Sequence, residues 1–564
     1  MEALDWVVIG VFFLALIGII VWVVRQKQND SADYFLGGRD ATWLAIGASI
    51  FASNIGSEHL IGLAGAGASS GMAMAHWEIQ GWMILILGWV FVPFYTRSMV
   101  YTMPEFLERR YNPQSRTILS VISLVSYVLT KVAVTVYAGG LVFQQVFGIK
   151  ELWGIDFFWI AAIGLVLLTA LYTIFGGMKS VLYTSVLQTP ILLLGSLIIL
   201  VLGFKELGGW DEMMKVCGAV TVNDYGDTMT NLIRSNDDAN FPWLGALIGS
   251  AIIGFWYWCT DQFIVQRVLS GKNEKEARRG TIFGAYLKLL PVFLFLIPGM
   301  IAFALHQKYI GAGGEGFLPM LANGNANADA AFPTLVAKLL PAGVKGLVVC
   351  GILAALMSSL ASLFNSSAML FTIDFYKRFR PETPEKKLVG IGQIATVVIV
   401  ILGILWIPIM RSVGDVLYTY LQDVQSVLAP GIAAAFLLGI CWKRTSAQGG
   451  MWGLISGMVI GLTRLGAKVY YSNVGEVADS TFKYLFYDMN WLFFCGWMFL
   501  FCIIVVIVVS LATEAPTTEK IQGLVFGTAT KEQKAATRAS WNHWDIIHTV
   551  IILAITGAFY WYFW

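Results

Sequence analysis

Polar and aromatic side chains that could bind a small solute occur inside long apolar stretches of the sequence. They come from separate segments: Asn54, His59, Glu78, Tyr257, Trp258, Lys288 and Gln422. Together they supply hydrogen-bond donors and acceptors as well as flat apolar faces. A sugar ring uses both, because its hydroxyl groups need hydrogen bonds and its C–H face packs on an aromatic ring. Structural explanations stay open, since Lys288 could extend to an interface or pair locally and Trp258 could be interfacial.

Two further segments could hold a bare cation. In the stretch 51–59 (FASNIGSEH), small and polar residues replace the expected Leu, Ile and Val, and Gly56 can bend the chain. The glycines that follow could serve only for close helix packing, but that explanation does not account for Glu58 and His59, which cost energy inside a span unless they have partners or face water. The stretch 354–362 (AALMSSLAS) places hydroxyls on one face, although such serines often bond their own helix. Carbonyls of an unwound segment facing these hydroxyls would form a cluster of neutral oxygens, which suits Na⁺.

The elements that position these residues are expected to be membrane helices. The chain has 564 residues, of which 57% are hydrophobic and 13% charged, against about 25% charged in soluble domains. Apolar stretches of about 20 residues, enough to span a bilayer, recur along the whole chain. We expect roughly fourteen spans, near 5–24, 42–67, 75–96, 117–147, 154–174, 181–203, 242–266, 281–305, 343–374, 388–410, 413–440, 449–467, 487–510 and 546–563.

The basic residues orient this map. Of the 37 Lys and Arg residues, 24 lie in loops on one side of the expected membrane and 11 on the other. The positive-inside rule then places both termini outside a cell membrane. The first span begins with acidic residues, so we interpret it as a retained helix and not as a cleaved signal peptide. The other two basic residues, Lys131 and Lys288, lie inside expected spans, and both are candidates for function.

Other classes of protein are disfavoured by the same sequence. The net charge of +2 gives no clustered basic face for nucleic acid, and the six cysteines show no metal-ligand or disulfide spacing. Five scattered histidines and the lack of a phosphate-binding loop or nucleophile motif argue against an enzyme and against ATP as the energy source. We expect no obligate protein partner.

Several long strings resemble the sodium/solute symporter family, of the sodium/glucose cotransporter type, from about residue 30 to 510. They are GASIFASNIGSEHLIGLAGAGASSG, GFWYWCTDQFIVQR, AALMSSLASLFNSSAMLFTIDFYK and YLQDVQSVLAPGIAAAFLLGICWKR. The resemblance implies an all-α polytopic membrane protein with a LeuT-type core of five plus five helices in inverted repeat. The expected parts are an N-terminal helix and inner loop (1–41), the first repeat (42–203), an outer loop (204–241), the second repeat (242–440, with an outer loop at 306–342) and C-terminal flanking helices (441–564).

The resemblance also implies roles for individual residues. For Na⁺ it implies the carbonyls of Ala52, Ile55 and Ala355 and the hydroxyls of Ser358 and Ser359. For a sugar it implies Asn54, His59, Glu78, Lys288 and Gln422, with Tyr257 stacking on the ring as the inner gate and Trp258 beside it. For the outer gate it implies Leu63, Trp77 and Tyr418.

Some positions depart from the family pattern. Ser185 stands where many members have Asp, and Ala361 where they have a hydroxyl residue, which favours one Na⁺ per cycle over two. Gly81 and Gly254 replace polar residues that contact sugar in some relatives, so selectivity could differ or water could fill the gap.

The hypothesis from the sequence is therefore Na⁺-driven symport of a hexose, such as glucose or galactose, into the cell by alternating access. The alternatives are symport of another solute, such as an inositol, a different sugar or an organic acid, and a sugar sensor or channel on the same scaffold.

Overall fold

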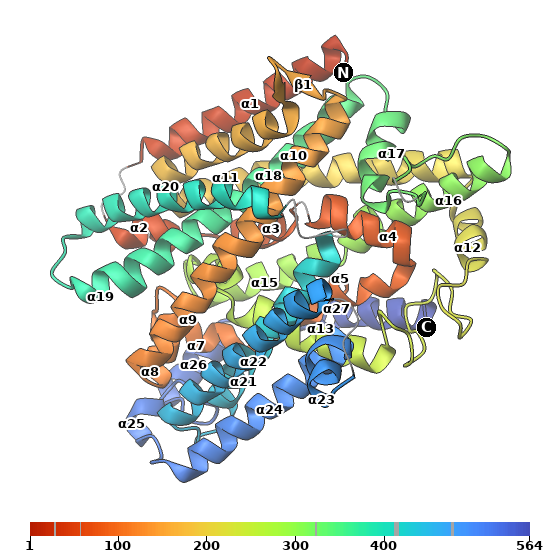
Figure 1. Ribbon diagram of the computed structural model, residues 1–564. Coiled ribbons are helices and arrows are strands. Elements are labelled where there is room, and N and C mark those ends of the chain that lie inside the picture. Colours follow the sequence, from red (N-terminus) through yellow and green to blue (C-terminus); the bar gives the residue numbers. More distant parts are fainter. Residues whose placement is uncertain (27–29, 57, 322–323, 411–416, 475–478) are drawn as a thin grey trace.

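The computed structural model describes residues 1–26, 30–56, 58–321, 324–410, 417–474 and 479–564, and it is almost wholly helical. Figure 1 shows the helices packed together in one body, where they cross at different angles, with the N-terminal end of the chain at the upper edge. Ten helical stretches among the described residues are long and apolar enough to cross a membrane. The expected total of fourteen spans stays a prediction.

The first part of the chain, from the N-terminal helix through the expected first repeat into the outer loop, contains a short hairpin and a series of helices. The strands are β1 (Glu151–Leu152) and β2 (Ile155–Asp156). The helices are α1 (Ala3–Val24), α2 (Ser31–Leu36), α3 (Trp43–Asn54), η2 (Glu58–Leu63), α4 (Ala64–Ser70), α5 (Ala75–Glu78), α6 (Gly81–Ile86), α7 (Val92–Ser98), α8 (Met103–Arg110), α9 (Pro113–Ser126), η5 (Tyr127–Val132), α10 (Ala133–Phe147), α11 (Phe157–Leu207) and α12 (Trp210–Gly218).

The remaining helices continue to the C-terminus. They are α13 (Trp243–Phe255), η6 (Trp256–Thr260), α14 (Gln262–Leu269), α15 (Glu274–Lys288), η7 (Val292–Leu296), α16 (Ile297–Gly311), η8 (Ala328–Ala330), α17 (Ala331–Leu339), α18 (Val344–Met369), η9 (Leu370–Tyr376), α19 (Lys377–Phe379), α20 (Glu385–Met410), α21 (Leu417–Cys441), α22 (Ala447–Val474), α23 (Thr481–Lys483), η10 (Tyr484–Asp488), α24 (Trp491–Ala512), α25 (Thr518–Ile521), α26 (Lys531–Ala539) and α27 (His543–Tyr562).

Helix α11 combines two of the expected spans. A straight helix of its 51 residues would be about 77 Å long at 1.5 Å per residue, more than twice the hydrocarbon thickness of about 30 Å. The break is at Gly177, whose φ of 53° and ψ of −150° are accessible to glycine and strained for other residues. The chain therefore makes two membrane passes here, as the sequence predicts.

Two helices are broken in the middle. Helix α3 ends where Ile55 adopts an extended conformation (φ −79°, ψ 104°), which confirms the predicted gap in the expected span 42–67. The second break is at Asp261 (φ −75°, ψ 128°), between η6 and α14. The sequence map places a span at 242–266 and does not predict this break, where Asp261 caps α14 with its side chain by accepting a hydrogen bond from the Phe263 N–H.

Glycines bring α4 against α16. A Cβ added at Gly67 would lie 2.2 Å from the Leu296 carbonyl oxygen, and one added at Gly299 would lie 2.0 Å from the Ala64 carbonyl oxygen. Only glycine permits this backbone-to-backbone approach. The close-packing role considered for the glycines after the first break is thus confirmed, and it exists alongside the break itself.

Candidate functional site

An internal cavity lies where the two broken helices meet α15, α18 and α21. All seven residues predicted to bind solute line it: Asn54, His59, Glu78, Tyr257, Trp258, Lys288 and Gln422. Trp77 and Ser359, which the sequence assigns to the outer gate and the Na⁺ site, line it too. Residues up to 368 positions apart in the chain therefore face one space, as the sequence predicts for a binding site.

A buried ion network crosses one wall of this cavity. The Lys288 Nζ donates to Glu78 Oε2 at 2.6 Å, and His59 Nε2 lies 3.2 Å from the same oxygen. The three side chains are at most 4% exposed. Charges buried in this way require partners, and here the carboxylate balances the ammonium. The wall as a whole suits a neutral solute better than an ion.

Several polar atoms around the cavity keep unused hydrogen-bonding capacity. Within the described part of the chain, no partner lies within hydrogen-bonding distance of His59 Nδ1, Gln422 Oε1 or Trp77 Nε1. Buried polar atoms are nearly always bonded, so unpaired ones around a cavity mark positions where a ligand can bind. The set includes donors and acceptors, which is what a polyhydroxylated solute requires.

Aromatic rings form another wall. The rings of Tyr257 and Trp258 lie 4.9 Å apart at 87° to each other, and the Lys288 ammonium lies 5.3 Å from the Trp258 ring. Trp77 stacks on Trp491 at 5.5 Å and meets Phe241 edge to face at 6.1 Å. These contacts hold the rings in fixed orientations, so they can offer a rigid apolar face to a sugar or cyclitol ring.

The break at Ile55 faces the serines of α18. Because α3 stops here, the carbonyls of its last turn, which includes Ala52, lose their helical partners. A Cβ added at Gly56 would lie 2.5 Å from Glu58 Oε2 and 3.1 Å from Ser359 Oγ, so this hydroxyl and the Glu58 carboxylate both lie beside the unwound backbone. One turn away, Ser53 Oγ and Ser362 Oγ are 2.6 Å apart. The region thus combines carbonyls at a helix end with hydroxyls, and a Na⁺ site at Ala52, Ile55, Ala355, Ser358 and Ser359 stays a prediction.

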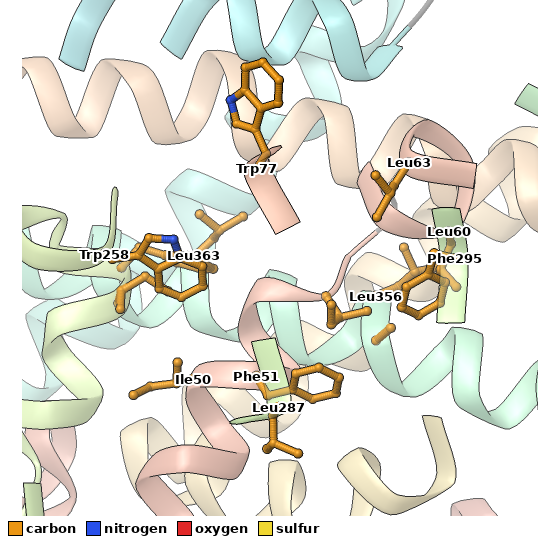
Figure 2. Close-up of a cluster of buried hydrophobic side chains, with 14 of the residues drawn as sticks. Ile50, Phe51, Leu60, Leu63, Trp77, Trp258, Leu287, Phe295, Leu356 and Leu363 are labelled. Atoms are coloured by element: carbon orange, nitrogen blue, oxygen red, sulfur yellow. The ribbon is translucent and has the colours of Figure 1, made fainter. Parts of the chain in front are cut away.

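The three expected outer-gate residues differ in their position relative to the cavity. Figure 2 shows Trp77 and Leu63 toward the same side of the broken helix, with Phe51 and Leu287 toward the opposite side. Leu63 is fully buried and is not among the residues that line the cavity. Tyr418 belongs to α21, but its side chain lies outside the described residues.

The structure explains the two glycines that depart from the family pattern. A Cβ at Gly254 would lie 2.5 Å from Gln80 Oε1, so the Gln80 amide, and not water, occupies the space beside this glycine. Gly81 instead faces the Ala285 carbonyl oxygen, 2.8 Å from where a Cβ would be, and permits close packing of α6 on α15. An effect of these two glycines on solute selectivity stays a prediction.

Four polar side chains that line the cavity are missing from the sequence-based site: Glu58, Gln80, Lys131 and Gln425. Glu58 and Lys131 carry a signal, because both are charged and lie inside expected spans. Gln425 follows Gln422 by three residues and therefore shares its helix face. Gln80 has no such signal, since its role depends on the space that Gly254 leaves.

A helical membrane protein with two broken helices around a central polar cavity has the architecture of a secondary transporter. Comparison with known proteins identifies the kind. The sequence model of the Sodium:solute symporter family matches residues 34–457, and the chain belongs to that family. Sodium/myo-inositol cotransporter 2 of Mus musculus is 37% identical over 542 residues, which cover 94% of this chain and 80% of that protein.

Other relatives agree on family and fold. Sodium/glucose cotransporter 4 of Danio rerio is 36% identical over 537 residues, covering 92% of this chain and 80% of that protein. The solved structure of a Na⁺-coupled sialic acid symporter in a substrate-bound outward-open state superposes with a TM-score of 0.73 at 22% identity, covering 92% of this chain and 99% of that chain. The chain is a multi-pass membrane transporter with a LeuT-type fold and not an enzyme, as the sequence predicts.

Proposed function

We propose that the chain carries a neutral polyhydroxylated six-membered ring, a hexose or an inositol, into the cell together with Na⁺. The observation that carries this proposal is the pairing of Lys288 with Glu78 beside unpartnered polar atoms and fixed aromatic rings. A balanced pair leaves no net charge to attract an organic anion. The hexose hypothesis and its inositol alternative both fit, and the relatives named above include carriers of each kind.

The arrangement of the two breaks supports alternating access. One break falls in the first helix of each expected repeat, at Ile55 in 42–203 and at Asp261 in 242–440, as an inverted repeat requires. With both termini outside, as the basic residues indicate, α14 leads toward the cytoplasm. Na⁺ bound between α3 and α18 would favour the state open to the outside and so favour solute binding. Trp77, Leu63 and Tyr418 would then close above the solute, and Tyr257 would move to release it inward.

A single Na⁺ per cycle is the stoichiometry we propose. Ser185 Oγ donates to the Val181 carbonyl at 2.6 Å and lies 3.3 Å from Ser358 Oγ, so a neutral hydroxyl occupies the position where many relatives place a carboxylate. One charge moving across about 100 mV contributes ~2.3 kcal/mol. A tenfold Na⁺ gradient adds ~1.4 kcal/mol, which together support accumulation of roughly several hundredfold.

Purified protein in liposomes tests the proposal. Radiolabelled myo-inositol and D-glucose should each be compared in an inward Na⁺ gradient and in an equal K⁺ gradient. Accumulation of either solute above equilibrium only with Na⁺ supports symport, and competition by a series of hexoses and inositols ranks the substrates. A solute-evoked current without accumulation would instead indicate a sensor or channel.

A further inference from the structure

A cluster of three charged residues, Lys131, Asp261 and Arg267, lies at the second helix break, and Lys131 also lines the cavity. Asp261 occupies the second helix break, and its carboxylate accepts hydrogen bonds from the Phe263 N–H at 3.2 Å, from Lys131 Nζ at 2.6 Å and from the Tyr127 hydroxyl. Lys131 and Tyr127 belong to η5, which the sequence assigns to the other repeat. One carboxylate therefore ties the break in the second repeat to a helix of the first.

The third charge, Arg267, is fully buried. None of its three guanidinium nitrogens has a hydrogen-bond partner among the described residues. Its guanidinium carbon lies 5.0 Å from the centre of the Phe263 ring, while Lys131 Nζ lies 4.8 Å from the same ring. Leaving a buried charge unpaired costs several kcal/mol, and a cation–π contact returns only about 0.5–2 kcal/mol.

Two cations thus stand near the Asp261 carboxylate, and the Glu58 carboxylate, which also lines the cavity, interacts with Lys131 as well. Arg267 attracts the oppositely charged Asp261 and repels the like-charged Lys131. Arg267 follows Asp261 by six residues, about 9 Å along a straight helix, so its binding to the carboxylate requires a change at the helix break as well as a change of rotamer. If Lys131 released the carboxylate, Arg267 could bind it, so neither arrangement leaves Asp261 without a cation.

The pairing of Lys131 bears directly on the exit from the cavity. Lys131, Tyr257 and Phe263 all line the cavity, and the Lys131 ammonium lies 4.7 Å from the Tyr257 ring. A solute that leaves toward the end of α14 must pass these side chains. While Lys131 bonds Asp261, it also holds the Tyr257 ring by a cation–π contact.

We propose that Lys131 and Arg267 bind Asp261 alternately, and that transfer of this carboxylate from Lys131 to Arg267 opens the path from the cavity toward the end of α14. Both cations are positioning residues for release of the solute. This role does not depend on which solute the protein carries. The two therefore act in opposite directions: Lys131 stabilises the closed exit and Arg267 the open one.

The test uses the full-length protein with a cysteine at Val134, a residue that lines the cavity. In vesicles that expose the end of α14, labelling of this cysteine by a membrane-impermeant maleimide reports opening of the exit. Arg267→Gln should slow labelling and solute turnover at least tenfold while the solute Kd changes less than threefold. Lys131→Met should speed labelling at least tenfold. Arg278→Gln, at a buried arginine that is bonded to Glu274, serves as the control for loss of a buried guanidinium.

Opposite effects of the two substitutions support the exchange. Changes in the same direction, or slowing in Arg267→Gln no greater than in Arg278→Gln, would overturn it. If Arg267→Gln does not reach the membrane, Arg267→Lys decides the question, because the shorter cation should slow labelling at least threefold at unchanged solute Kd. Labelling of Arg267→Lys at the wild-type rate would overturn the proposal.

Discussion

Replacing Glu78 by glutamine removes the charge that balances Lys288 and leaves the shape of the side chain almost unchanged. The two side chains are 2% and 4% exposed, and their charged atoms are 2.6 Å apart. Removing one partner of a buried pair costs about 3–5 kcal/mol. Glutamine still offers an oxygen to the ammonium, so we expect the lower value, about 3 kcal/mol.

This penalty should appear in solute binding. The uncompensated Lys288 ammonium would turn to other acceptors around the cavity, of which Gln422 Oε1 is one without a protein partner. It would then compete with the hydroxyl groups of the solute. At ~1.4 kcal/mol for each factor of ten, a loss of 3 kcal/mol corresponds to solute affinity weaker by roughly 100-fold.

Calorimetric titration in saturating Na⁺ measures this affinity in Glu78→Gln, in Lys288→Met and in the double variant. The double variant removes both charges, so its loss should be smaller than the sum of the two single losses by at least about 1.5 kcal/mol. Strictly additive losses, or a Glu78→Gln affinity within threefold of wild type, would refute the claim that this pair organises the solute site.

Four other substitutions test the Na⁺ site, the solute cavity, the contact between α4 and α16, and a buried carboxyl group. Ser359→Ala should raise the Na⁺ concentration for half-maximal uptake, and unchanged Na⁺ dependence would place the ion elsewhere. Gln422→Ala should weaken solute binding by ~1–3 kcal/mol, and unaltered affinity would argue against the assigned cavity. Gly299→Ala should lower the thermal midpoint by several degrees, because the new methyl group meets a backbone carbonyl of α4 at 2.0 Å; a wild-type midpoint would show that α4 and α16 separate freely. Burial raises the pKa of Asp329, in the loop before α17, from 3.8 to about 7, so folding favours its protonated form. The stabilising contribution of the protonated Asp329 carboxyl group is full below about pH 4 and disappears as the pH rises to about 7. Thermal midpoints that change with pH in parallel for wild type and Asp329→Asn would contradict this.

Much of the fold could be predicted from the sequence because a bilayer imposes simple rules. Apolar stretches of the right length are helices, and α11 makes two passes because no single helix of its length fits the membrane. The break near Ile55 was predictable, since small and polar residues occupy the middle of that span. The polar Thr-Asp-Gln sequence at the second break is a similar signal. The aromatic and apolar residues on both sides of it, however, are typical of a single span.

The candidate site was predictable in its residues but not in its pairings. A charged residue within a span indicates function, and Glu78 and Lys288 indeed line the cavity. Their direct bond joins positions 210 residues apart, and spacing along the chain cannot establish such a contact. The same holds for Gln80 beside Gly254 and for Lys131 beside Asp261, which depend on how separate helices pack.

The central claim is that Na⁺ binding between the break at Ile55 and the serines of α18 drives solute accumulation. It is tested most directly by simultaneous uptake of ²²Na⁺ and labelled solute in liposomes, with wild-type protein and the Ser358→Ala/Ser359→Ala variant. The account predicts close to one Na⁺ per solute in wild type, and loss of both fluxes together in the variant at a Na⁺ concentration that saturates wild type. Solute accumulation in the variant with unchanged Na⁺ dependence would contradict it.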